Sequence, residues 1–130
     1  MAVWHGEKGK KPTGGEIHLG RKKKKRELGR LPTHIKIGTE KRKIEKTKGG
    51  GSKVKVSSAE FVNVLDAESN TVKKVKILDV VEHPDNPHFT RRGIITKGCT
   101  IKTELGLVKV TSRPSQCGVV NGIILEKEKS

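Results

Sequence analysis

A segment with the spacing of a phosphate-binding loop lies between positions 93 and 100, with the sequence Gly-Ile-Ile-Thr-Lys-Gly-Cys-Thr. Its two glycines have the GxxxxG separation, but Cys99 stands where the nucleotide-binding motif requires a lysine. The pattern around the segment is not that of a strand followed by a helix. Because the lysine that would reach the phosphates is missing, we expect no nucleotide site here.

Thiol and imidazole side chains are the next candidates, since Cys99, Cys117, His83 and His88 are of the types that bind zinc. Neither cysteine has a CxxC partner, and the separations do not fit the usual ligand spacing. Unpaired cysteines mostly pack as small apolar side chains, so we expect two buried, inert thiols and no metal site. The carboxylates of the C-terminal half look like turn and strand-end residues. The sequence therefore predicts no catalytic residue, no enzyme activity, no cofactor and no small-molecule substrate.

Positive charge is the dominant chemical feature. The 130 residues include 29 Lys and Arg against 14 Asp and Glu, a net charge of +15. Residues 1–53 hold 17 of these cations and 5 acids, a net of +12, whereas residues 54–130 hold 12 and 9, a net of +3. Runs of like charge that lack counter-ions are typical of segments that contact a polyanion. Glycines between the cations let the backbone approach phosphates closely.

The kind of nucleic acid follows from what the sequence lacks. Only Trp4, Phe61 and Phe89 are aromatic, too few for the stacking platforms of single-strand binders. Phe61 is expected in the core, and Trp4 either stacks on a base or anchors an interface. Recognition of a folded nucleic acid through its shape and phosphates is therefore favoured. There is no apolar run of about 20 residues and no signal-peptide pattern. With only two cysteines, we expect a soluble protein of a reducing, intracellular compartment without a membrane partner.

The elements that position these residues divide the chain into an arm and a domain. Residues 1–48 are too polar to bury a core and predict a basic, extended arm that is disordered in isolation. Within it, residues 12–15 permit a tight bend, and residues 22–30 form one helical turn or stay extended. Residues 41–48 either continue the arm or form a first barrel strand, and glycines 49–51 with Ser52 mark a hinge.

The remaining residues, 49–130, read as a chain of short strands. Apolar, β-branched segments alternate with turn signals about every 8–12 residues, whereas residues 83–88 and 113–115, which contain prolines, predict breaks. Strands are expected near residues 53–56, 61–65, 72–81, 94–96, 99–103, 107–111 and 119–125. The fold class predicted is all-β, a small antiparallel β-barrel with a long basic N-terminal arm.

Several motifs resemble one known family over essentially the whole chain. They are Met1–Gly6 (MAVWHG), Lys10–Gly15 (KKPTGG), Lys22–Arg30 (KKKKRELGR), Gly49-Gly50 before Lys53-Val54, Asn86–His88, Arg91-Arg92 and Thr111–Gln116 (TSRPSQ) with Gly118–Asn121 (GVVN). The chain resembles the small-subunit ribosomal protein family eight of the archaeal and eukaryotic type, which has no bacterial counterpart, in its short archaeal form. The resemblance implies a structural ribosomal protein of the cytoplasm whose partners are small-subunit rRNA and neighbouring ribosomal proteins.

The resemblance also implies which residues contact RNA. Phosphate contacts fall to Lys10, Lys11, Arg21, Lys22, Lys23, Lys24, Lys25, Arg26 and Arg30 in the arm, and to Arg91 and Arg92 in the domain. Thr13, Gly14 and Gly15 would form a bend whose amides face RNA, and Glu27 would pair with a neighbouring cation and orient the chain. Two alternatives stay open: a general nucleic-acid-binding or nucleoid-type protein, and a ribosome-assembly factor of the same family.

Overall fold

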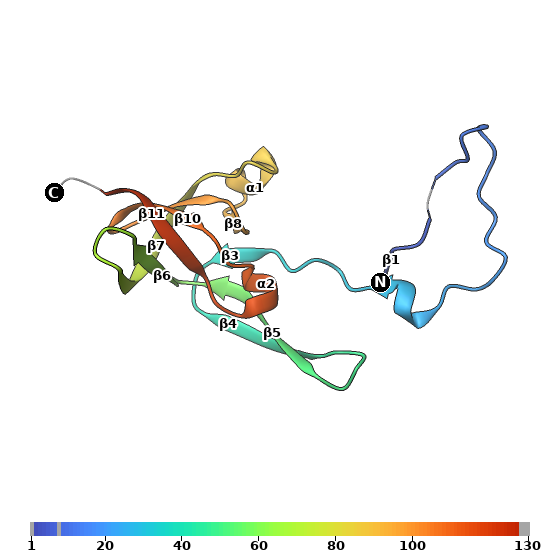
Figure 1. The fold of residues 1–130 in the computed structure, drawn as a ribbon, viewed down its shortest axis with the longest axis horizontal. Coiled ribbons are helices and arrows are strands. Elements are labelled where there is room, and N and C mark those ends of the chain that lie inside the picture. Colours follow the sequence, from blue (N-terminus) through green and yellow to red (C-terminus); the bar gives the residue numbers. More distant parts are fainter. Residues whose placement is uncertain (1, 8, 128–130) are drawn as a thin grey trace. The chain divides into compact units, whose positions relative to one another are not determined.

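The computed structural model describes residues 2–7 and 9–127, which form two compact units, Met1–Pro32 and Thr33–Ser130. The second unit is built on a closed barrel of five strands (Figure 1). In their order around the barrel, these are β10 (Gly106–Val110), β11 (Asn121–Lys127), β6 (Phe61–Asp66), β7 (Thr71–Glu82) and β9 (Thr100–Thr103). Side chains alternate along each strand, so Val62 and Val64 point inward while Phe61 is 40% exposed. The predicted β-barrel is confirmed.

The barrel is not purely antiparallel, which corrects the prediction. Four neighbouring pairs are antiparallel, but β11 runs parallel to β6, with Ile123 opposite Leu65. The cause is parity: strand directions that alternate around a closed ring need an even number of strands. With five strands, at least one pair must be parallel.

A four-stranded sheet joins the barrel in the second unit. Its order is β4 (Lys41–Lys46), β5 (Ser52–Ala59), β3 (Ile35–Ile37) and β8 (Ile94–Ile95). Strand β4 pairs with β5 in an antiparallel hairpin, and β3 pairs with β5 in parallel. Thus residues 41–46 form a strand, in this sheet and outside the closed barrel.

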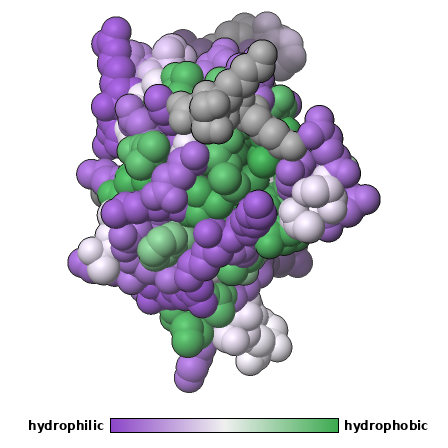
Figure 2. Space-filling model, turned by 90° about the vertical axis from the view of Figure 1, so that its left-hand side faces the viewer, coloured by the Kyte–Doolittle hydropathy of each residue, from purple (hydrophilic) through white to green (hydrophobic). Residues whose placement is uncertain are grey.

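Both sheets contribute to one apolar core. Ile35, Val56 and Ile95 come from the four-stranded sheet, and Ile101 and Val108 come from the barrel; all five are at most 2% exposed. Apolar side chains also remain on the surface, for example Val72 of β7 and Leu125 of β11. Figure 2 shows such apolar areas between hydrophilic ones on one face.

Two short helices interrupt the strands where the sequence predicts only loop or break. They are α1 (Pro87–Arg91) and α2 (Pro114–Cys117). Each begins at a proline, whose fixed φ and missing N–H suit the first helical position. Before Pro87, the Asn86 side chain accepts a hydrogen bond from the amide of His88 at 2.9 Å and caps α1. Prolines that predicted breaks therefore mark helix starts. None of the helices in the described part of the chain has the length and apolar character needed to cross a membrane.

The first unit is held by local pairings. Strand β1 (Val3–Trp4) pairs antiparallel with β2 (Leu28–Gly29), and a 3-10 helix, η1 (Lys25–Glu27), directly precedes β2. None of the described residues between 2 and 32 is buried. This unit is therefore held together by polar contacts and by the pairing of β1 with β2, and not by an apolar core.

Candidate nucleic-acid interface

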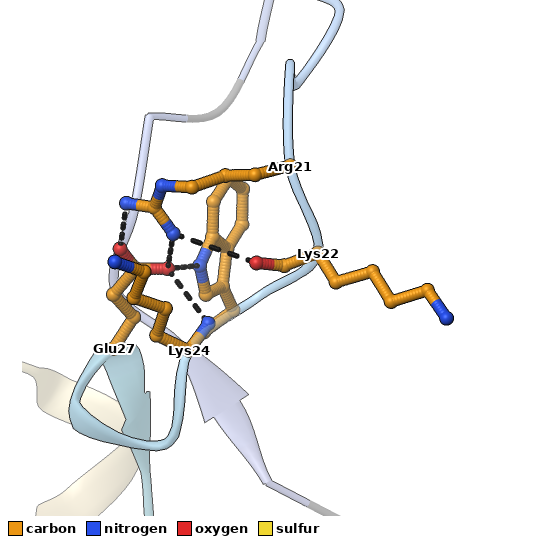
Figure 3. Close-up of polar contacts among 5 residues, drawn as sticks. Arg21, Lys22, Lys24 and Glu27 are labelled. Carbon is orange, nitrogen blue, oxygen red and sulfur yellow. Dashed lines mark hydrogen bonds and ion pairs between the residues drawn. The ribbon is translucent and has the colours of Figure 1, made fainter.

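The carboxylate of Glu27 is the central acceptor of the first unit (Figure 3). Arg21 donates to both of its oxygens, from Nη2 to Oε1 at 2.5 Å and from Nη1 to Oε2 at 3.3 Å. The indole Nε1 of Trp4 and the backbone amide of Lys24 donate to Oε2 at 3.4 and 3.2 Å. One side chain thus ties together three segments of the chain that span 23 residues. The expected pairing of Glu27 with a neighbouring cation is confirmed, and that cation is Arg21.

These contacts shift the titration of Glu27. The hydrogen bonds from Arg21, followed by that from the Lys24 amide, lower the pKa of Glu27 from 4.5 to about 2. The same pairing raises the pKa of Arg21. Hydrogen bonding and an adjacent opposite charge both favour the ionised carboxylate. Glu27 is therefore an anion throughout the neutral range, and it offsets the charge of Arg21.

Two glycines let aromatic rings lie against the backbone of the first unit. A Cβ atom on Gly6 would lie 2.1 Å from Cζ2 of Trp4, and one on Gly29 would lie 2.1 Å from Nε2 of His5. The ammonium of Lys23 lies 5.0 Å from the Trp4 ring centroid, a cation–π distance. Trp4 is half-buried by these contacts and serves here as an internal anchor of the first unit.

The predicted bend at residues 12–15 is a tight turn. The Gly14 amide donates to the Lys11 carbonyl at 2.9 Å, and the Lys11 amide donates to the Gly15 carbonyl at 2.8 Å. Gly14 has φ +85°, a conformation that favours glycine. The Gly14 N–H is therefore used inside the turn. Within the described chain, the amides of Thr13 and Gly15 have no such partner in the turn and are the ones available to an outside acceptor.

The predicted phosphate-binding cations of the first unit all lie on its surface. The exposed residues are Lys10, Lys11, Arg21, Lys22, Lys23, Lys24, Lys25, Arg26 and Arg30. They are not equivalent, because Arg21 is held by Glu27 and Lys23 lies over Trp4. Together with the remaining residues of this unit they amount to ten cations against three acids, a net of +7 over residues 1–32.

Arg91 and Arg92 lie in the second unit, at the end of α1. Arg91 is the last residue of the helix and Arg92 is its C-cap, and both are exposed. The helix is fixed by Phe89, whose ring lies 5.4 Å from the ring of His34 and 5.1 Å from that of His83, in the second case edge-on. The two arginines therefore lie at a helix end that Phe89 supports.

His83 lies behind this helix and is only 5% exposed. Its Nε2 is 2.5 Å from Oγ1 of Thr96, whereas its Nδ1 has no hydrogen-bond partner among the described residues. The ring therefore serves as packing for Phe89.

The two thiols differ, which corrects half of the expectation. Cys99 is fully buried, and burial raises its pKa. Cys117, at the last residue of α2, is exposed, so the expectation of two buried thiols is wrong for it. Helix α2 lies beside β5, and its first residue, Pro114, was interpreted from the sequence as a break. Within residues 2–7 and 9–127, no three His, Cys, Asp or Glu side chains gather as a metal-binding group would require.

Two pairings of functional residues were not predicted from the sequence. One is the use of Trp4 as an internal partner of Glu27, although Glu27 is the only acid between residues 17 and 39 and follows six consecutive cations. The other is the pairing of basic residues 41–46 with β5, which makes a two-stranded ribbon. The charge of that segment was visible in the sequence, but its partner strand was not.

Comparison with known proteins places these features in a family. The model of the family described as ribosomal protein S8e matches residues 4–125. A protein of Staphylothermus marinus named small ribosomal subunit protein eS8 is 49% identical over 128 residues, which cover 98% of this chain and all of that protein. A protein of the same name from Ignicoccus hospitalis is 48% identical over 130 residues, with 98% of this chain and all of that protein covered.

Proposed function

The chain belongs to the ribosomal protein S8e family and is a structural constituent of the small ribosomal subunit, of archaeal type, and on this premise we propose that it holds ribosomal RNA by phosphate and shape recognition. As a small-subunit protein it has ribosomal RNA and other ribosomal proteins as partners. The proposal concerns the surface that makes the RNA contact, and it includes a location on cytoplasmic ribosomes. A general nucleoid role and an assembly-factor role have no comparable support.

The observation that carries the proposal is the surface of the first unit. Its predicted contact cations are all exposed. Glu27 holds this part of the chain together by accepting hydrogen bonds from Arg21. The described residues of this unit form no apolar core and are organised around the Arg21–Glu27 ion pair, so the cations of the unit lie at its surface. Phosphate oxygens are the acceptors that such a surface fits, and lysine and arginine contacts to phosphate position a protein on RNA without reading its sequence.

The proposed contact set has two parts, one in each unit. In the first unit it comprises the cations of residues 10–11, 21–26 and 30, with the bend at Thr13, Gly14 and Gly15. In the second unit it comprises Arg91 and Arg92, which α1 supports. If about eight phosphates are neutralised, the logarithm of the association constant falls with the logarithm of salt concentration at a slope of about −6 to −7.

The test is binding of the full chain to deproteinised small-subunit ribosomal RNA at several salt concentrations. The variant K22Q/K24Q/R26Q removes three exposed cations and leaves Arg21, Lys23 and Glu27 in place. We expect the salt slope to become flatter by about 2 to 3, because each lost phosphate contact accounts for about 0.7–0.9.

The matched control is K73Q/K97Q/K109Q, which removes the same charge from exposed positions of the second unit outside the proposed contact set. A smaller change of slope is expected for the control. Equal losses in the two variants would mean that only net charge matters and would contradict the proposed contact surface. Circular dichroism checks that both variants keep the β signal of the wild-type chain.

A further inference from the structure

The β4–β5 ribbon, residues 41–55, concentrates positive charge in the second unit. It contains seven Lys and Arg residues and one acid, a net of +6 over 15 residues. Residues 41–48 were predicted either to continue the arm or to form a first barrel strand, and residues 49–55 belong to the part predicted as the barrel domain. Figure 1 shows the turn end of this hairpin reaching away from the barrel strands.

Few carboxylates balance this charge. Glu45 lies 2.7 Å from Nζ of Lys55 and 3.6 Å from Nζ of Lys43, so two cations share one acid. Arg42 donates from Nε to Glu40, just outside the ribbon, at 2.8 Å. With Glu40 included, residues 40–55 still carry a net charge of +5. The Lys43 side chain remains 69% exposed despite its contact.

The cations occupy both faces of the ribbon. Lys43 stands opposite Lys55 and Glu45 stands opposite Lys53, so three lysines share one face. The other face, on which residues 42, 44 and 46 lie, holds Arg42 and Lys46. A surface that met a partner on one side only would not need charge on its second face.

An apolar side chain lies among these cations. Ile44, on the face of Arg42 and Lys46, is 71% exposed and stands opposite Val54, which is 37% exposed. These two side chains form a small apolar area between the cations of this face.

Protection of a sheet edge explains only part of the charge. Strand β4 is an edge strand, and charged residues on an edge prevent pairing with other chains. Beyond β4, the turn carries Lys48, and Lys53 and Lys55 lie on the part of β5 that pairs with β4, before β3 joins β5 at Ser58 and Ala59. The excess charge therefore extends beyond β4.

The turn of the ribbon is narrow and nearly free of side chains. The Thr47 amide and hydroxyl both donate to the Gly51 carbonyl, at 2.7 and 2.9 Å. Gly50 has φ +86°, and a Cβ atom on Gly49 or Gly50 would meet nothing within 4 Å. Backbone without side chains approaches phosphates closely. The ribbon thus ends in a slender tip followed on both strands by cations.

We propose that the β4–β5 ribbon is a second RNA-binding element, which lies between two segments of RNA backbone and contacts phosphates from both faces. This inference rests on the proposed function and extends it to a surface outside the contact set given above. Charge on two faces with a glycine tip fits a gap between RNA segments better than the flat surface of an acidic protein, and folded RNA is recognised mainly through its shape and phosphates.

The experiment compares the ribbon variant K43Q/K46Q/K48Q with the control K73Q/K97Q/K109Q on deproteinised small-subunit ribosomal RNA. All six lysines are exposed, and both variants lose three charges. The expected result is a salt slope flatter by about 2 to 3 for the ribbon variant and a smaller change for the control. The variant K43R/K46R/K48R keeps the charge and is expected to bind like the wild-type chain.

A second measurement uses the wild-type chain, so it does not depend on folding of a variant. An amine-reactive reagent followed by mass spectrometry is expected to show RNA-dependent protection of Lys43, Lys46 and Lys48 relative to the three control lysines. Equal slopes and equal protection for the two sets of lysines would overturn the ribbon proposal. The charge of the ribbon would then indicate contact with an acidic protein. If only the ribbon proposal is wrong, K22Q/K24Q/R26Q still weakens RNA binding. If RNA binding by the wild-type chain lacks a steep salt slope, the proposed function itself is wrong.

Discussion

Acid titration of Glu27, observed through Trp4, tests whether the first unit has the described structure in solution. Trp4 is the only tryptophan and the chain has no tyrosine, so intrinsic fluorescence reports on this unit alone. The indole N–H donates to the Glu27 carboxylate at 3.4 Å, and Lys23 lies over the ring. Protonation of Glu27 weakens the contacts from Arg21 and Trp4, and the emission spectrum is expected to change with it.

The expected midpoint follows from the contacts of the carboxylate. Arg21 and the Lys24 amide lower the pKa of Glu27 from 4.5 to about 2. A group whose pKa is lowered by folding contributes stability that is fully present above the unfolded value and is lost as pH falls toward the folded value. The closed first unit should therefore persist at pH 4.5, weaken below it, and show a fluorescence midpoint close to pH 2.

Two variants assign the transition to Glu27. In E27Q the acid transition should be absent and the emission at pH 7 should differ from that of the wild-type chain, because the ion pair with Arg21 is gone. In E16Q, which changes another carboxylate of the same unit, the wild-type midpoint should remain. A wild-type midpoint near 4.5 would refute the reasoning, because it would show that Glu27 is not held by Arg21 in the free protein.

Three further predictions concern the second unit. In G122A, the added Cβ would lie 2.5 Å from Cγ1 of Val108, so overpacking should lower the free energy of unfolding by about 1–3 kcal/mol in urea titrations followed by circular dichroism. In I101A, removal of a fully buried side chain should lower it by about 2–5 kcal/mol in the same assay. A thiol reagent at pH 7 should label Cys117 in the folded protein and Cys99 only after denaturation, as mass spectrometry of peptides would show.

Controls for these predictions come from the same unit. G49A adds a Cβ that meets nothing within 4 Å, and it should change stability far less than G122A. L78A removes a side chain that is 49% exposed, and it should cost clearly less than I101A. Equal effects within either pair would contradict the described packing, and labelling of both thiols in the folded chain would contradict the burial of Cys99.

Local patterns in the sequence were sufficient for most strands of the second unit, but not for β3 (Ile35–Ile37), which was predicted as part of the arm. Residues 53–56 alternate polar and apolar side chains, and segments such as residues 61–65 and 107–111 are rich in β-branched and other apolar residues, a composition typical of strands wherever they lie in the fold. The tight turn at residues 12–15 was equally predictable, because proline and glycine restrict or permit backbone angles locally. The starts of α1 and α2 were missed, since a proline is compatible with both a break and a first helical position.

The sequence by itself thus determined the charge of residues 1–53, the strand-forming segments and the family motifs, all of which depend on residue type and short spacing. The tertiary structure decided the parallel pairing of β11 with β6, the ribbon of β4 with β5, and the meeting of Trp4 and Arg21 at Glu27. The physical reason is that strand pairing and ion pairs depend on which segments, distant in the sequence, lie side by side in the folded chain. Side-chain alternation along one strand carries no information about the strand beside it.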